Sequence, residues 1–139
     1  MRAIQSRYDH RRPKIFGQQV LYDTGSNILT IPVGIAHEMN ITRPDYIGNL
    51  GRSCLDNAAG TITRDMVLVR VCLGVEWSGE IFGKCFTETA SIEESDTGGV
   101  DLLSGYGMRD QFCFATTEGN RFLLVGTTTE ALIARLRRE

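Results

Sequence analysis

One aspartate stands where a strand is expected to end in a tight turn. Asp23 follows Ile15 to Tyr22, a stretch rich in strand-forming residues, and a second apolar run, Ile28 to Pro32, comes shortly after it. A carboxylate at the end of a buried strand has little solvent and many backbone donors around it, and such surroundings shift a carboxyl pKa. The pattern predicts that Asp23 is a catalytic acid or base.

The three residues after Asp23 suit a turn that would hold its carboxylate. Gly25 allows the backbone to approach closely, because glycine has no Cβ. Thr24 is expected to brace the turn, and we expect backbone amides and the Ser26 hydroxyl to bond the Asp23 oxygens. The plainer alternative stays open, since Asp-Thr-Gly forms turns in many proteins without any catalytic role.

The sequence Asp23-Thr24-Gly25-Ser26, between two apolar strands of which the second ends in Pro32, resembles the active-site turn of pepsin-like and retropepsin-like aspartic peptidases. The segment Val100 to Gly105 is similar to the family's apolar-apolar-Gly element, which packs beside the catalytic turn. The resemblance implies that Leu102 and Leu103 line the substrate pocket. Ser104 departs from the pattern, because the family usually has glycine directly after the apolar pair.

A small-residue patch occupies the position of the family's flap, a hairpin that closes over bound peptide. The expected hairpin covers Leu55 to Asp65, and its substrate-binding tip is formed by Asn57, Ala58, Ala59 and Gly60. Because this segment contains no tyrosine, the retropepsin comparison fits better than the pepsin comparison.

The mechanism that the resemblance implies needs two carboxylates. At close range both cannot be ionised, so one acts as a base toward water while the other donates a proton to the scissile carbonyl. An internal second turn, Asp96-Thr97-Gly98, is rejected because Ser91 to Ser95 is too polar for a buried entering strand and Gly99-Val100 does not rebuild the second strand. A homodimer in which each copy supplies Asp23 is the simplest solution. Met1 to Ser6 and Phe112 to Val125 are expected to form the dimer sheet.

These motifs require a mostly β fold, expected as a closed antiparallel β-barrel-like acid-protease lobe with one or two short helices and a C-terminal helix. We expect an N-terminal arm over 1–14, the peptidase lobe over 15–126 and the final helix over 127–139. The predicted elements are a strand within 3–6, strands at 66–73 and 81–87, a helix at 33–39 closed by Asn40, a loop at 42–53, a helical turn at 108–111, a hairpin of 112–116 with 121–125, and a helix at 129–138 capped by Thr129.

Composition argues against several other classes. The 139 residues are sized for one domain, and a formal net charge of -2 gives no general case for nucleic acid or an anionic membrane as partner. The basic residues near both ends are interpreted as solvated surface. No run is long and apolar enough to span a membrane, and no apolar leader is seen, so we expect a cytoplasmic protein.

Cysteine and histidine spacing predicts neither a metal site nor a cofactor. Cys54, Cys72, Cys85 and Cys113 form no CxxC pair, and we expect them to be reduced thiols rather than a disulfide framework. His10 and His37 have no nucleophile at catalytic spacing, and the glycines build no phosphate-binding loop.

Three functions remain compatible with the sequence. The first is a homodimeric aspartic endopeptidase that acts on peptide or polyprotein substrates, with polyprotein processing as its role. The second is a non-catalytic dimerisation or peptide-binding module that keeps the retropepsin fold. The third is a regulatory protease domain of the ubiquitin-shuttle type.

Overall fold

A computed structural model describes residues 1–3, 20–21, 26–57, 60–74, 78, 80–94 and 102–138. Several sequence predictions fall outside these residues. They are Asp23, Thr24, Gly25, Ala58, Ala59, Asp96-Thr97-Gly98 and most of the N-terminal arm.

The described residues are mostly strand, as predicted. Seven strands form one sheet in the order β1-β5-β6-β3-β7-β2, and β4 pairs with β5 outside this path. The strands are β1 (Arg2–Ala3), β2 (Val20–Leu21), β3 (Leu29–Pro32), β4 (Asn49–Asn57), β5 (Gly60–Gly74), β6 (Ile81–Glu93) and β7 (Leu102–Leu103). Most pairings are antiparallel, but β2 pairs with β7 and β3 pairs with β6 in parallel.

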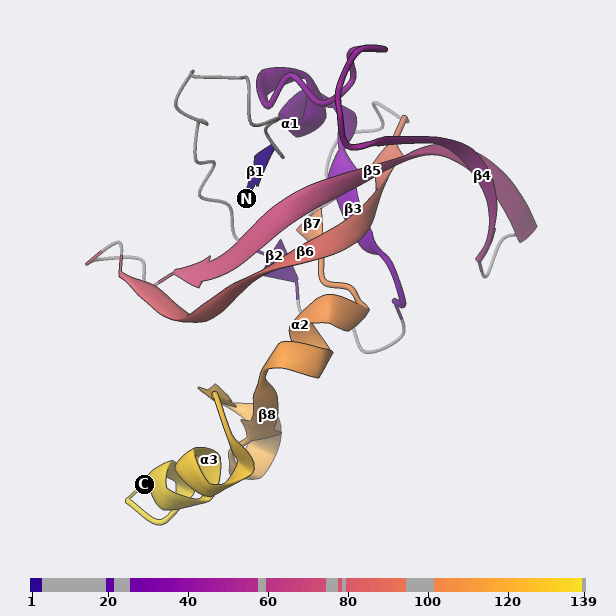
Figure 1. Cartoon of the computed structure of the whole chain (residues 1–139). Coiled ribbons are helices and arrows are strands. Elements are labelled where there is room, and N and C mark those ends of the chain that lie inside the picture. Colours follow the sequence, from indigo (N-terminus) through magenta and orange to yellow (C-terminus); the bar gives the residue numbers. More distant parts are fainter. Residues whose placement is uncertain are drawn as a thin grey trace.

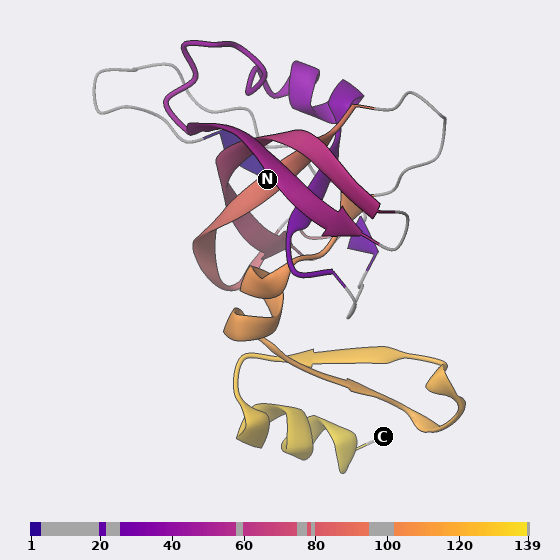
Figure 2. The same ribbon diagram turned by 90° about the vertical axis from the view of Figure 1, so that its right-hand side faces the viewer.

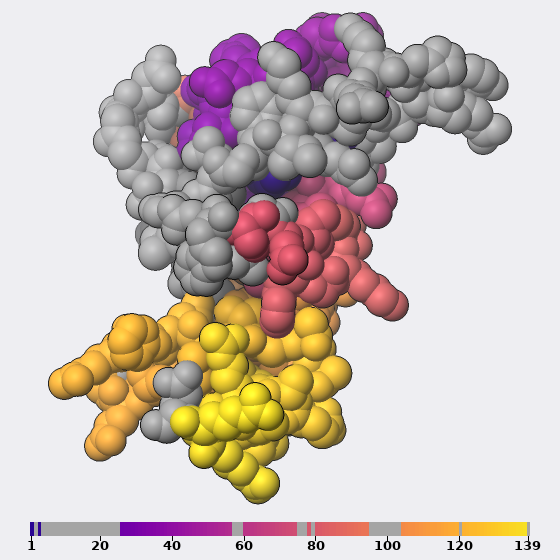
Figure 3. All heavy atoms as spheres, turned by 90° about the vertical axis from the view of Figure 1, so that its left-hand side faces the viewer, coloured from indigo at the N-terminus to yellow at the C-terminus, as the bar shows by residue number. Residues whose placement is uncertain are grey.

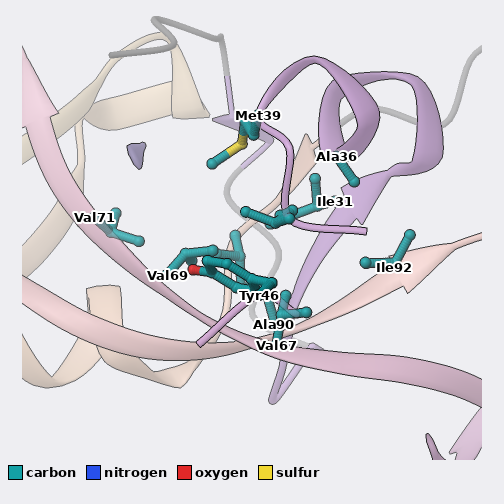
Figure 4. Close-up of a cluster of buried hydrophobic side chains, with 11 residues drawn as sticks. Ile31, Ala36, Met39, Tyr46, Val67, Val69, Val71, Ala90 and Ile92 are labelled. Atoms are coloured by element: carbon teal, nitrogen blue, oxygen red, sulfur yellow. The ribbon is translucent and has the colours of Figure 1, made fainter. Parts of the chain in front are cut away.

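The long strands β5 and β6 cross the molecule together, and helix α1 (Val33–Glu38) lies over one end of them (Figure 1). We call this sheet with α1 the lobe. Its core collects apolar side chains from several elements, and nine of the eleven buried members are labelled in Figure 4. Ile31, Val69 and Ala90 are completely buried. Alternating apolar residues on β3, β5 and β6 produce this core, because every second side chain of a strand points to the same face.

Helix α1 confirms the prediction for residues 33–39. Pro32 precedes its first turn, and Asn40 ends it with a φ of 58°. Asparagine tolerates this left-handed conformation better than most residues, which explains the abrupt end.

The hairpin predicted over Leu55 to Asp65 is longer than expected. The loop expected over 42–53 is wrong from Asn49 onward, because β4 begins there and pairs with β5 as far as Asn57. Gly48 packs too tightly for a side chain, and its carbonyl accepts a bond from the Leu68 amide at 2.7 Å. This contact starts the hairpin earlier than local turn residues indicate.

The C-terminal unit comprises β8 (Cys113–Thr116), a 3-10 turn at Glu118–Asn120, β9 (Leu123–Gly126) and helix α3 (Thr129–Leu136). Figure 2 shows it as a layer below the lobe, and Figure 3 shows it as a distinct part of the surface. The predicted hairpin and helix are confirmed. The predicted cap is wrong by one residue, because the extended residue before the helix is Thr128, whose hydroxyl oxygen accepts from the Ala131 amide at 3.1 Å.

Two cysteines form a disulfide, so the expectation of four reduced thiols is wrong. Cys72 on β5 and Cys85 on β6 are bonded, with their Cα atoms 4.4 Å apart. The regular β5–β6 register, in which Val71 faces Phe86, continues by one residue to place Cys72 opposite Cys85, and the ladder becomes irregular only before Leu73. Cys54 and Cys113 are free thiols.

Among the described residues, no helix has the length and apolar content needed to cross a bilayer.

Candidate active site

Strand β7 lies between the two strands that flank residues 22–25. Leu103 on β7 pairs in parallel with Leu21 on β2 and antiparallel with Thr30 on β3. One residue is therefore the common partner of both chain segments. The four residues 22–25 connect β2 to Ser26, so β7 holds the two ends of the predicted catalytic turn together. The backbone of Leu102 and Leu103 thus lies beside this turn's flanking strands, and the assignment of their side chains to the substrate pocket stays a prediction.

Three consecutive backbone carbonyl groups, those of Ser26, Asn27 and Ile28, all accept hydrogen bonds. The Ser26 carbonyl accepts from the Arg109 guanidinium at 2.6 Å, and the Asn27 carbonyl accepts from the Tyr106 amide at 3.1 Å. The Ile28 carbonyl accepts from the Ser26 hydroxyl at 2.8 Å. The Ser26 hydroxyl therefore has an acceptor within its own segment, and the predicted bond from Ser26 to Asp23 lies outside the described residues.

The residue after Ser104 is a glycine at which the packing leaves no room for a side chain. Ser104 is fully buried, and a Cβ on Gly105 would lie 2.9 Å from the Ile28 carbonyl carbon and 2.5 Å from a Glu88 oxygen. Real Cβ atoms do not approach backbone so closely. Gly105 therefore allows this close approach, because it has no Cβ.

A buried carboxylate lies beside this glycine. Glu88 on β6 is 8% exposed, and its Oε1 accepts from the Gly107 amide at 2.9 Å. Burial raises the pKa of the Glu88 carboxyl above its usual range, and the Asp110 charge adds to this effect. The Gly107 amide and the Arg109 charge oppose it. The net result is an ionisable group in the lobe's interior, beside helix α2 (Tyr106–Gln111).

The β4–β5 hairpin extends past the rest of the sheet. Strand β5 pairs with β6 only from Met66 onward, whereas its pairing with β4 begins at Gly60. The projecting six residues of β5 span about 20 Å. Asn57 and Gly60 face each other across the end of the hairpin, so these two predicted flap residues lie at its tip. Most residues of the projection are exposed on β4 and on the outer part of β5.

Ion pairs connect the base of this hairpin to the end of β6. Arg52 on β4 bonds Asp65 at 3.0 Å and Glu94 at 2.9 Å, and these three side chains are about half exposed. Arg64 on β5 forms an ion pair with Glu93, and both side chains are largely buried. Fewer water molecules can therefore compete for the charges of the Arg64–Glu93 pair than for those of Arg52 and its two partners.

Two neighbours of the turn were missed by sequence reasoning, Glu88 and Arg109. A signal for Glu88 exists, because Phe86, Glu88, Ala90 and Ile92 alternate along one strand and only the glutamate is charged. Arg109 gives no such signal, because an arginine in a short helix is ordinarily a surface residue.

One premise used against a second internal turn is wrong. The segment expected to be too polar for a buried strand is the end of β6, where Ser91 is 1% and Ile92 is 2% exposed. Ser91 is accepted in the interior because its hydroxyl lies 3.5 Å from that of Thr30, within hydrogen-bonding reach. The second premise concerns Gly99 and Val100, which lie outside the described residues.

The described residues include no group of three or more His, Cys, Asp or Glu side chains that could hold a metal ion. Buried side-chain oxygen and nitrogen atoms among the same residues all have hydrogen-bond partners. No protein-family model, curated protein or solved structure matches this chain.

Proposed function

We propose that this protein is an aspartic endopeptidase that acts as a homodimer, in which each copy contributes Asp23 to a shared pair of carboxylates. The observation that carries the proposal is the position of β7, whose Leu103 pairs with both strands that flank residues 22–25. The proposal includes an acid-protease lobe of the closed, barrel-like type, for which the mostly β sheet is a suitable frame.

The reaction follows from the electrostatics of two neighbouring carboxyl groups. Mutual repulsion keeps one Asp23 protonated while its mate is ionised. The ionised carboxylate removes a proton from water as the water oxygen attacks the peptide carbonyl carbon. The protonated carboxyl donates its hydrogen to the carbonyl oxygen, giving a tetrahedral diol. As the C–N bond breaks, the carboxyl that took the water proton gives it to the leaving nitrogen, and the other carboxylate takes a proton from a diol hydroxyl, which restores the starting pair.

The β4–β5 hairpin supports the flap assignment. Its outer part has no partner strand among the described residues other than within the hairpin, and Asn57 and Gly60 stand at its end. An extended peptide has unpaired backbone groups, and a projecting hairpin offers a second strand to bond them. The hairpin would therefore lie over the bound substrate.

The C-terminal unit supports association with a second copy. Phe122 is 65% exposed, and Leu123, Ile133 and Leu136 are also exposed on this unit. Burial of such side chains favours association by about 25 cal/mol per Å² of apolar area. The proposed pair of catalytic carboxylates requires two copies of the chain. Burial of this apolar surface would favour their association.

The test compares the purified chain with Asp23→Asn and Asp96→Asn variants on a mixed peptide library from about pH 4 to about pH 7, with pepstatin as inhibitor. We expect pepstatin-sensitive cleavage in the wild type and in Asp96→Asn, and none in Asp23→Asn. Circular dichroism and sedimentation show whether each variant is folded and dimeric. Loss of cleavage in Asp96→Asn would instead place the second carboxylate within one chain.

Mixing the two proteins tests the sharing of carboxylates directly. If each dimer needs two copies of Asp23, adding excess folded Asp23→Asn chain lowers wild-type activity as mixed dimers form. Activity that is unchanged in mixtures with proven subunit exchange contradicts the shared pair. A folded wild-type dimer that cleaves nothing in the library would favour the non-catalytic peptide-binding module.

A further inference from the structure

The first turn of α2 is capped by a side chain from a different element. The residue at its N-cap is Gly105, which has no side chain to accept the helix's first amide hydrogens. Glu88 Oε1, from β6, accepts from the Gly107 amide at 2.9 Å. Gly107 is the second residue of the helix, which is where a capping oxygen normally bonds. Glu88 thus performs the capping role from the neighbouring sheet.

Two glycines allow the carboxyl group to sit directly against the helix backbone. A Cβ on Gly105 would lie 2.5 Å from Glu88 Oε1, and a Cβ on Gly107 would lie 2.9 Å from Glu88 Cδ. Any other residue at either position would force the carboxyl group away. The packing therefore fits α2 to Glu88 at close range.

The same helix holds the backbone that follows the predicted catalytic turn. The Arg109 guanidinium donates to the Ser26 carbonyl at 2.6 Å and lies 5.0 Å from the centre of the Tyr106 ring. The Tyr106 amide donates to the Asn27 carbonyl at 3.1 Å. Two consecutive carbonyls are therefore bonded to one helical turn. Figure 1 shows α2 at the edge of the crossing strands, between the lobe and the C-terminal unit.

We propose that Glu88 and Arg109 are positioning residues that hold α2 against Ser26 and Asn27 and thereby fix the turn that carries Asp23. This inference rests on the proposed peptidase function and adds to it two residues outside the active-site turn. We call the set formed by Glu88, α2 and the Ser26–Asn27 backbone the clamp. Glu88 fixes the position of α2 through the Gly107 amide, and Arg109 bonds α2 to the Ser26 carbonyl. The position of the helix thereby determines that of the turn.

A positional role predicts a specific kinetic effect. A displacement of a reacting group by about 1 Å can lower the rate about a hundredfold without removing any catalytic group. In the described residues the bonds of the clamp reach the backbone of Ser26 and Asn27, and none reaches Asn57 or Gly60 at the tip of the hairpin. Loss of the clamp should therefore lower kcat and leave KM close to that of the wild type.

The experiment measures kcat and KM for Arg109→Ala, Arg109→Lys, Glu88→Ala and Glu88→Gln in the full chain, with Asp110→Asn as the matched control. Asp110 is an exposed carboxylate on the same helix and makes no bond to Ser26 or Asn27 in the described residues. We expect Arg109→Ala and Glu88→Ala to lower kcat by about tenfold to a hundredfold. Asp110→Asn should stay within about twofold of wild type.

Conservative variants separate positioning from general stability. Glu88→Gln keeps a carbonyl oxygen for the Gly107 amide, and we expect it to recover kcat to within about threefold of the wild type. Arg109→Lys keeps one donor and should recover part of the loss. The double variant Glu88→Ala with Arg109→Ala should lose no more than the worse single variant, because both act through one helix.

Hydrogen exchange measures whether the clamp protects the backbone of residues 26–29, and it does not depend on catalysis. Peptides covering residues 26–29 should lose protection in Arg109→Ala and Glu88→Ala, whereas peptides from the core of β5 should not. Unchanged exchange at 26–29, wild-type kcat in both alanine variants, or an equal loss in Asp110→Asn would each overturn the clamp. If the wild type cleaves no peptide, the peptidase proposal fails, and the exchange measurement alone decides the clamp.

Discussion

The lobe and the C-terminal unit bury their apolar side chains to different extents. In the lobe, residues from α1, β3, β5 and β6 form one continuous core. In the C-terminal unit, Leu124 and Leu132 are buried, while Phe122 and Ile133 on the same unit are 65% and 44% exposed. A two-stranded hairpin with one helix is too thin to cover both of its faces. The comparison indicates that the lobe supplies most of the folding free energy and that the C-terminal unit has surface left for association.

The two parts are joined by an aromatic contact. Phe112, which precedes β8, stacks on Phe82 with ring centres 5.9 Å apart and meets the edge of Phe86 at 6.3 Å. Gly83, between those two residues, has no room for a Cβ beside the Phe112 ring. The hairpin formed by β5 and β6 is thus the support on which the C-terminal unit rests.

The largest effect is expected from a cavity in the lobe core. Ile31 is completely buried, so Ile31→Ala should lower the free energy of unfolding by about 4 kcal/mol. The matched change Ile133→Ala, at an exposed position of α3, should cost less than about 1 kcal/mol. Urea denaturation measures both values. Equal losses would show that the two regions do not differ as their burial indicates.

The disulfide should add to the lobe's advantage. Joining residues 13 apart in sequence is expected to contribute about 3 kcal/mol by restricting the unfolded chain. Thermal unfolding of a Cys72→Ser and Cys85→Ser double variant should therefore show a clearly lower Tm. Cys54→Ser, which removes an exposed free thiol, is the control and should leave Tm unchanged. A double variant as stable as the wild type would contradict this role.

A smaller effect is expected when the thin C-terminal unit is weakened. Leu132 is 6% exposed and packs near Gly126, so Leu132→Ala should cost about 2 kcal/mol. Because this unit has few buried contacts, we expect it to open locally before the lobe unfolds. Hydrogen exchange should show faster exchange in β8 and β9 with little change in β5. Equal acceleration in both regions would mean that they unfold as one.

The smallest effect concerns pH. Burial raises the pKa of Glu88, so the folded protein binds its proton more tightly than the unfolded chain does. The stabilisation is complete below the ordinary glutamate pKa and is lost as pH rises through the raised one. Arg109 and Asp110 are the charged groups that act on this carboxyl in the described part of α2.

Glu88→Gln should flatten this part of the pH dependence. The variant cannot ionise, so its Tm relative to that of the wild type should rise between about pH 4 and about pH 7. Asp110→Asn keeps the ionisable Glu88 and removes a charge that raises its pKa, so its pH dependence should remain but move toward lower pH. Parallel Tm curves for wild type and Glu88→Gln would show that Glu88 does not titrate in this range.

Local chemistry made several elements predictable. Pro32 and Asn40 bound helix α1, and the glycine-containing turn at 118–120 joins β8 to β9. These signals act within a few residues and depend little on the rest of the fold. The strands on either side of residues 22–25 were predicted in the same way, as was the hairpin that ends at Asn57 and Gly60. Asp23 itself lies outside the described residues and stays a prediction.

Pairing between distant strands was decided only by the tertiary structure. The sequence shows that Cys72 and Cys85 lie in or near strands, but the antiparallel register of the β5–β6 ladder makes them partners. It shows a glutamate at position 88, but the close packing of that side chain depends on Gly105 and Gly107, at the start of a helix that is distant in sequence. Composition and periodicity thus determined a mostly β chain with one strand-turn-strand motif around Asp23. The position of β7 between the two flanking strands, and the contact of α2 with Ser26 and Asn27, required long-range contacts that no local pattern encodes.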